Sequence, residues 1–156
     1  MAVTLVYVDR SRWGQSASIR QDLTRIYDDA FAERIGGQAA APFIEDHLAE
    51  KQFFACARFD ARLLGAVAIF EADDRAWWLS ELCVRESARR RGVGSRLMAL
   101  LAEQAGEQKR TLRIDTAALP LADRILLSRI GYRPRTGETG EHGFHEYVEL
   151  DPQGNG

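Results

Sequence analysis

A short arginine- and glycine-rich segment, residues 85–97 (RESARRRGVGSRL), carries the clearest chemical signature of the sequence. Gly92 and Gly94 follow the three consecutive arginines at 89–91. Glycine lets the backbone adopt unusual angles and approach a bound group closely, and the planar guanidinium group suits phosphate. The segment therefore predicts a site for a phosphate-bearing ligand. The alternatives are a nucleic-acid surface and a solvated loop.

The elements on either side of this segment favour the phosphate site. Residues 77–84 (WWLSELCV) have the pattern of a strand, and apolar residues recur at helical spacing from residue 93 onward. The start of a helix presents N–H groups that lack intrahelical partners, together with a partial positive charge, and both attract anions. The segment is neither a P-loop, because the motif's lysine is absent, nor a Rossmann loop, because Leu97 stands at the third glycine position.

Composition limits the other function classes. The chain has 156 residues, with 21 basic and 23 acidic side chains and a net charge of -2, which argues against a general nucleic-acid binder. The length predicts a single domain over residues 1–150, followed by a disordered polar tail at 151–156. No apolar run reaches the ~18 residues of a membrane span, so we expect a cytoplasmic protein that does not bind membranes. Cys56 and Cys83 lack metal-ligand spacing, which predicts buried free thiols and no metal.

The pattern of apolar residues predicts the elements that hold the loop. We expect strands at 4–8, 53–59, 62–70, 77–84, 111–115 and 144–150, with a tight two-residue turn at 60–61. We expect helices around residues 19–30, at 42–50, from 93 to a stop at Gly106, and at 120–130. In the last helix, which should stop at Gly131, the inward face is predicted to hold Leu121, Ile125, Leu126 and Ile130. Residues 133–143 read as a mobile loop. This order predicts one mixed sheet with helices on both faces.

The arginine–glycine segment resembles a known family. Residues 89–94 (RRRGVG) resemble the [Q/R]xxGxG/A loop of the GNAT acetyltransferase superfamily, and residues 81–101 resemble its whole strand–loop–helix motif. Residues 126–134 (LLSRIGYRP) are similar to its helix followed by a Gly-aromatic pair. The resemblance implies the α/β (α+β) GNAT fold, with one mixed, mostly antiparallel sheet, helices on both faces and splayed central strands.

The same resemblance implies acetyl-CoA as the cofactor, with its pantetheine arm between the splayed strands. Carried over by position, the pantetheine side is lined by Leu82, Cys83 and Val84. By the same resemblance, the pyrophosphate would be wrapped by Arg89, Arg90, Arg91, Gly92, Val93, Gly94 and Ser95.

A narrower resemblance concerns residues 57–67 (ARFDARLLGAV) and 82–94. They are similar to the PanZ/PanM group of small GNAT-fold proteins. These proteins bind acetyl-CoA and the aspartate 1-decarboxylase zymogen, and they promote or regulate its self-processing. The resemblance therefore adds this decarboxylase as a partner.

Catalytic residues are less clearly marked than cofactor residues. Many GNAT enzymes place a general-acid tyrosine four residues before the Gly-aromatic pair, and here that position holds Leu127. Glu81, on the central strand, is the candidate general base. The alternative is a structural carboxylate paired with one of the many arginines. Tyr132 fits a packing role. For His142 and His145 the alternatives are a solvated loop or a role in acceptor binding.

Two functions therefore remain open from the sequence. The first is N-acetyl transfer from acetyl-CoA to a small-molecule or protein amine, for which water relays could replace the missing tyrosine. The second is a non-catalytic, acetyl-CoA-dependent regulator of aspartate 1-decarboxylase. The sequence leaves open the acceptor, and it also leaves open whether the chain forms a homodimer.

Overall fold

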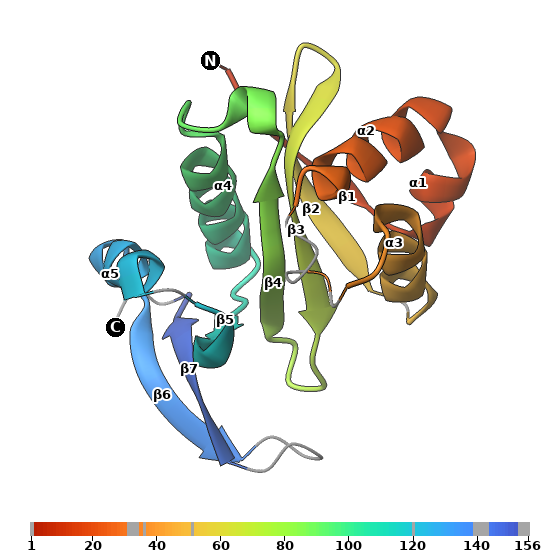
Figure 1. Ribbon diagram of the computed structural model, residues 1–156. Helices are drawn as coiled ribbons and strands as arrows, with labels where there is room; N and C mark the ends of the chain where they lie inside the picture. Colours follow the sequence, from red (N-terminus) through yellow and green to blue (C-terminus); the bar gives the residue numbers. More distant parts are fainter. Residues whose placement is uncertain are drawn as a thin grey trace. The chain divides into compact units, whose positions relative to one another are not determined.

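The computed structural model describes residues 2–30, 35, 37–50, 52–119, 121–138 and 144–152. Its elements, labelled in Figure 1, are β1 (Thr4–Val8), α1 (Arg10–Gln15), α2 (Ala17–Asp28), α3 (Ala40–Ala49), β2 (Phe53–Phe59), β3 (Arg62–Glu71), β4 (Trp77–Val84), α4 (Val93–Glu107), β5 (Leu112–Asp115), α5 (Leu121–Arg129), β6 (Arg133–Glu138) and β7 (Phe144–Leu150). Within the described residues, seven strands form one sheet in the order β1-β2-β3-β4-β5-β7-β6. The β4–β5 pair is parallel, whereas β1–β2, β2–β3, β5–β7 and β6–β7 are antiparallel, which confirms the predicted mixed sheet.

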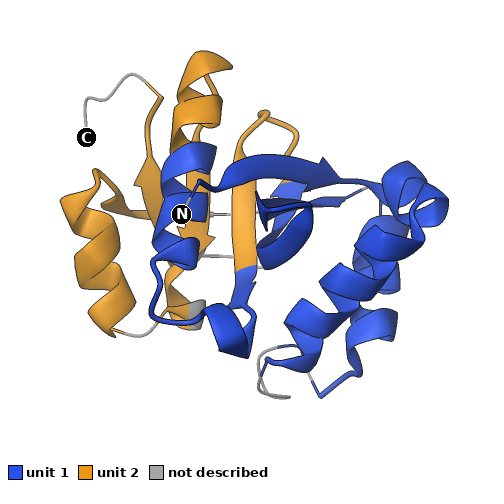
Figure 2. Cartoon of the chain, turned by 90° about the horizontal axis from the view of Figure 1, so that it is seen from above, with its two compact units in different colours: residues 1–70, 81–101 blue, residues 71–80, 102–156 orange. Residues whose placement is uncertain are grey.

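The chain divides into two compact units, coloured separately in Figure 2. Unit 1 comprises residues 1–70 and 81–101, and unit 2 comprises residues 71–80 and 102–156. Strand β4 therefore contributes its first residues to unit 2 and its last residues, which lead into the arginine–glycine segment, to unit 1. The single domain over residues 1–150 stays a prediction, and residues 153–156 of the expected tail lie outside the described part.

The core of unit 1 joins α2 and α3 to one face of its strands. Leu23, Ile26 and Tyr27 of α2 recur at helical spacing, and Phe54 and Cys56 alternate along β2; all five are buried in one cluster. The Ser16 hydroxyl caps α2 by accepting a hydrogen bond from the Ile19 N–H at 3.2 Å. Both cysteines, Cys56 and Cys83, are buried free thiols, as predicted.

The other face of the same strands approaches α4. The side chains of Ala66 and Ala68 in β3 point into the core cluster. Because side chains alternate along a strand, a side chain at Gly65 would lie on the opposite face. A Cβ atom at Gly65 would lie 3.2 Å from Cγ1 of Val93, the first residue of α4. Helices thus pack on both faces of the unit 1 strands, which confirms that prediction.

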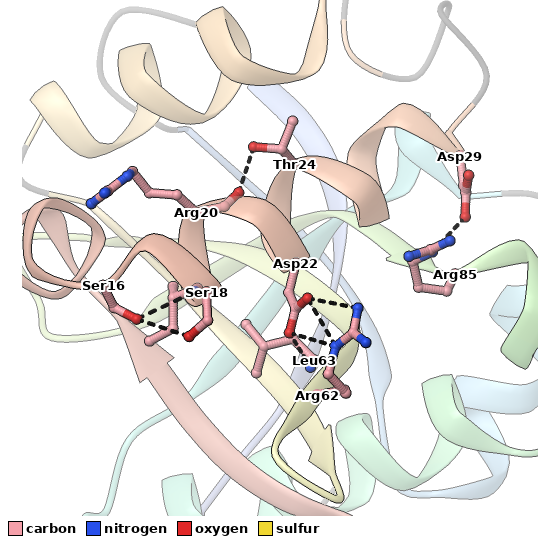
Figure 3. Close-up of polar contacts among 10 residues, drawn as sticks. Ser16, Ser18, Arg20, Asp22, Thr24, Asp29, Arg62, Leu63 and Arg85 are labelled. Carbon is pink, nitrogen blue, oxygen red and sulfur yellow. Dashed lines mark hydrogen bonds and ion pairs between the residues drawn. The ribbon is translucent and has the colours of Figure 1, made fainter.

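The predicted two-residue turn between β2 and β3 is also present. Asp60 and Ala61 have φ angles of 47° and 64°, the pair of left-handed residues that a type I′ turn requires. The adjoining start of β3 is held by Asp22 of α2. Its carboxylate pairs with the Arg62 guanidinium at 3.0 Å and accepts the Leu63 N–H at 3.1 Å (Figure 3).

Unit 2 corrects two of the sequence-based predictions. Residues 133–138, expected in a mobile loop, form strand β6 and pair with β7. The loop was predicted because the segment lacks apolar residues that could pack in a core, whereas β6 is held by backbone pairing with β7. Residues 139–143 lie outside the described part. The apolar residues of α5 expected to face inward are instead exposed. The relative exposures of Leu121, Ile125, Leu126 and Ile130 are 71%, 48%, 57% and 52%.

The second prediction fails because α5 packs against the rest of unit 2 through a different face from the predicted one. Leu127 is the buried residue of the helix, and the Arg124 guanidinium, one turn earlier, donates to the carbonyls of Thr116 at 2.9 Å and Leu119 at 3.2 Å. The stop at Gly131 is confirmed, because its φ is +110°. The stop predicted at Gly106 is not, since α4 continues to Glu107 and the left-handed residue beyond it is Lys109 (φ 57°).

Candidate functional site

The arginine–glycine segment forms the predicted junction between the end of β4 and the start of α4. Its backbone runs through a 3₁₀ turn at Glu86–Ala88, and then through left-handed angles at Arg90 (φ 68°) and Gly92 (φ 77°). The Arg96 N–H donates to the Gly92 carbonyl at 2.9 Å, so Gly92 directly precedes α4. The N–H groups of residues 93–95 therefore come before the first intrahelical donor and point out of the positive end of the helix dipole.

The two glycines of the segment have different roles. A Cβ at Gly92 would meet nothing within 4 Å, so this glycine is needed for its left-handed backbone and leaves open space beside it. A Cβ at Gly94 would lie 3.4 Å from Cγ2 of Val84 and 3.9 Å from Cδ2 of Leu82. Gly94 therefore allows the first turn of α4 to pack closely on the end of β4.

The predicted pantetheine residues divide between the faces of β4. Leu82 and Val84 lie on the side of α4, because both approach Gly94. The Cys83 side chain lies on the opposite side, within the core of α2 and α3, where its thiol donates to the Ile26 carbonyl at 3.2 Å. Cys83 can therefore offer only its backbone to a ligand on the α4 side.

The arginines of the segment also fall into two groups. The Arg85 Nε donates to Asp29 Oδ2 at 2.9 Å, and the Arg89 Nη2 donates to the Asp29 carbonyl at 2.6 Å, so both guanidinium groups are held at the end of α2 (Figure 3 draws the first contact). Arg90, Arg91 and Arg96 are exposed, and among the described residues their side chains have no hydrogen bond or ion pair. These three side chains are available to an anion, whereas Arg85 and Arg89 shape the loop.

Glu81 lies just before this site, in a strained segment of β4. Its φ is +52°, a conformation that non-glycine residues rarely adopt. Its carbonyl accepts a hydrogen bond from the buried Tyr27 hydroxyl at 2.9 Å, and the residue is half-buried. Burial raises the pKa of Tyr27 well above its usual value, so this hydroxyl stays protonated and remains a donor. The fold thus holds the backbone of Glu81 in a fixed, unusual position.

Leu127, at the position where many GNAT enzymes have a tyrosine, and its neighbours Ser128 and Tyr132 lie in unit 2. Leu127 is buried, and the Ser128 hydroxyl donates to the Ile125 carbonyl at 2.9 Å. Tyr132 is 1% exposed, its hydroxyl has no partner among the described residues, and burial raises its pKa, so its environment fits packing. His142 and the side chain of His145 lie outside the described residues.

A cavity of about 390 Å³ lies in unit 2 and includes Arg124, Ser128, Tyr132 and Glu146 in its lining. It contains no residue of the arginine–glycine segment.

Within the part of the chain that the structure describes, no cluster of three metal-ligating side chains is present. Among the same residues, no helix is both long and apolar enough to span a bilayer.

Sequence reasoning missed three residues that shape the site. Asp29 and Tyr27 reach it from α2, more than 50 positions away in the chain, and Gly65 reaches it from β3. Gly65 lay within a predicted strand, where an isolated glycine signals a close approach of another backbone. No local pattern marks Asp29 or Tyr27.

Comparison with known proteins gives a matching family model and similar solved structures. A family model described as "Acetyltransferase (GNAT) domain, PanZ" matches residues 12–128. The solved structure of aminoglycoside 6'-acetyltransferase type Ii is similar with a TM-score of 0.68 and 16% sequence identity, over 96% of this chain and 97% of that chain. An aminoglycoside 6'-N-acetyltransferase complexed with coenzyme A gives a TM-score of 0.66 at 14% identity, over 96% of this chain and 97% of that chain.

The ribosomal-protein-S18-alanine N-acetyltransferase from Escherichia coli gives a TM-score of 0.64 at 15% identity, over 96% of this chain and 94% of that chain. At these identities the likeness establishes the fold alone. A search of curated proteins gives no match.

Proposed function

The chain belongs to the PanZ family of GNAT acetyltransferase domains, and we propose that it binds acetyl-CoA through residues 89–95 and acts as an acetyl-CoA-dependent regulator of aspartate 1-decarboxylase. The observation that carries the cofactor proposal is the start of α4. There the left-handed Gly92 opens the backbone, and no atom lies within 4 Å of its missing Cβ. A helix start of this kind is suited to bind a pyrophosphate.

The charges around this opening fit the cofactor as well. Arg90, Arg91 and Arg96 are exposed, and among the described residues their guanidinium groups have no anionic partner. The N–H groups of Val93 and Gly94 would hold the pyrophosphate, while the arginines would face the cofactor's phosphates. Leu82 and Val84, on the side of α4, would supply the apolar wall for pantetheine.

A regulatory role is favoured by the family and by the lack of a general acid at the usual tyrosine position, which belongs to the described part of the chain. Leu127 stands where many GNAT enzymes have a tyrosine, and Tyr132 is buried with a raised pKa. Neither side chain can readily give a proton to a leaving thiolate. A protein that senses acetyl-CoA by binding it does not need that proton.

The test is the self-cleavage of a purified aspartate 1-decarboxylase zymogen, followed by gel electrophoresis with and without this protein and acetyl-CoA. We expect faster cleavage only when both are present. Gly94→Val should abolish the effect, because the new side chain would meet Val84. Gly106→Val in the same helix is the matched control, since a Cβ there meets nothing within 4 Å. Cleavage at the same rate in all samples would exclude the regulatory role.

N-acetyl transfer is the second candidate function, and the position of Glu81 on β4 favours it. Acetyl-CoA, when bound, supplies an acetyl thioester for attack by an amine. The half-buried Glu81 carboxylate, on a strand held by Tyr27, would take the proton that the ammonium group of the acceptor must lose. Release of the CoA thiol with a panel of amines should then exceed release without amine and fall in Glu81→Gln. No amine-dependent release would eliminate this candidate.

A further inference from the structure

Asp29, the C-cap residue of α2, makes three contacts with the segment that leads into the proposed cofactor loop. Its Oδ2 accepts hydrogen bonds from Arg85 Nε and from the Glu86 N–H, both at 2.9 Å. Its backbone carbonyl accepts Nη2 of Arg89 at 2.6 Å. One residue of α2 thus binds the segment at three successive points, one of which is drawn in Figure 3.

These contacts fix the chain almost up to the ligand-binding residues. The Arg89 Nε also donates to the Val84 carbonyl at 3.3 Å, and the Ala88 N–H donates to the Arg85 carbonyl at 2.9 Å. Residues 84–89 are therefore tied to each other and to α2. Only residues 90–92 separate this tied segment from α4, and two of them need left-handed angles.

The charge of Asp29 suits this task. Burial alone would raise the pKa of its carboxyl group, but hydrogen bonds from Glu86 and Arg85 and the charges of Arg85 and Arg89 lower the pKa overall. The group is therefore ionised at neutral pH. It supplies the negative charge that offsets two of the crowded arginines of the segment, while Arg90 and Arg91 stay exposed.

We propose that Asp29 is a positioning residue for the cofactor loop: it holds Arg85, Glu86 and Arg89 so that the N–H groups at the start of α4 and the exposed arginines are arranged before the ligand arrives. The proposal rests on the proposed acetyl-CoA binding. Pre-arranged groups bind more tightly because less conformational freedom is lost on binding. Asp29 itself does not touch the ligand.

The same helix supplies a matched control. Asp22, two turns earlier in α2, also binds one arginine and one backbone N–H, those of Arg62 and Leu63 (Figure 3). Its contacts hold the β2–β3 hairpin and make no link to residues 84–95. A purely structural role for such a contact would lower stability equally well at either position.

The experiment is calorimetric titration of acetyl-CoA into the wild-type chain, Asp29→Asn and Asp22→Asn, with thermal unfolding of each. We expect Asp29→Asn to raise Kd about tenfold, which corresponds to loss of one charge-assisted contact. Asp22→Asn should lower the unfolding temperature yet leave Kd within about twofold. Equal Kd values for Asp29→Asn and wild type would overturn the proposal, as would an equal rise in both variants.

A second variant keeps the test decisive if Asp29→Asn folds poorly. Arg85→Gln removes the same ion pair from the other side and should also raise Kd. In the double variant Kd should match that of Asp29→Asn alone, because both changes break one unit; independent, multiplying effects would contradict the proposal. If the wild-type chain binds no acetyl-CoA, the proposed function fails and this inference fails with it, whereas binding that is insensitive to Asp29 overturns only the inference.

Discussion

Replacing Gly92 by alanine tests the backbone requirement of the loop without creating a clash inside the protein. Gly92 has a φ of +77°, and a Cβ there would touch nothing within 4 Å. The added methyl group therefore causes no clash, and its cost is the left-handed angle alone. Gly106, near the end of α4, also has open space around its Cβ position, but its φ does not lie in the left-handed region. Gly106→Ala is thus the matched control.

The expected magnitudes follow from these two angles. A left-handed conformation costs a residue with a Cβ roughly 1–2 kcal/mol, and part of this is offset by about 0.4–1 kcal/mol from the stiffer unfolded chain. The net effect of Gly92→Ala should be a loss of about 1 kcal/mol in the free energy of unfolding. For a chain of this length that lowers Tm by about 2–4 °C. Gly106→Ala should instead raise stability by about 0.5–1 kcal/mol.

The assay is thermal unfolding together with titration of acetyl-CoA. The Gly92 methyl group would occupy the open side of the loop, so we expect Kd to rise at least tenfold in Gly92→Ala and to stay unchanged in Gly106→Ala. Two results would refute the reasoning. One is a Gly92→Ala variant as stable as Gly106→Ala, which would show that residue 92 is not left-handed. The other is unchanged affinity in Gly92→Ala, which would place the ligand elsewhere.

Three further predictions test contacts within unit 1. Tyr27→Phe removes the donor to the Glu81 carbonyl and should lower the free energy of unfolding in urea by about 1–2 kcal/mol; no change would show that this contact is not formed. Burial lowers the pKa of His47 in the folded chain, so as the pH falls below 6.5 this side chain is protonated in the unfolded chain before it is protonated in the folded chain. The urea midpoint of unfolding should therefore drop below pH 6.5 in the wild type but not in His47→Phe. In Gly65→Val the new Cβ would lie 3.2 Å from Cγ1 of Val93, so the substitution should lower the free energy of unfolding by about 1–3 kcal/mol and weaken acetyl-CoA binding. Wild-type stability together with wild-type affinity would contradict the close approach of β3 to the start of α4.

The junction of β4, loop and α4 could be predicted because its signals are local. An apolar strand, two glycines and a helical repeat follow one another within about 30 residues, and each depends on backbone preferences of its own segment. The hairpin turn at Asp60 and the stop at Gly131 were predictable for the same reason. The cofactor-binding residues themselves stay a prediction.

Other features depend on contacts that no local pattern encodes. The apolar spacing of α5 marks a face but does not say which face the rest of unit 2 covers, and the structure buries Leu127 while leaving Leu121 exposed. Strand β6 has few apolar residues and is held by its pairing with β7. The contacts of Asp29 and Tyr27 with residues 81–89 cross more than 50 positions of chain, so a single sequence gives no sign of them.

The central claim is that acetyl-CoA binds where α4 begins, and backbone amide NMR tests it most directly. Titration of acetyl-CoA into the ¹⁵N-labelled chain should shift the N–H signals of Val93, Gly94 and Ser95 most strongly, because these groups would donate to the pyrophosphate. The Asp22 signal and those of the β2–β3 hairpin should move little. Saturable binding that leaves residues 93–95 unshifted, or no binding at all, would contradict the account.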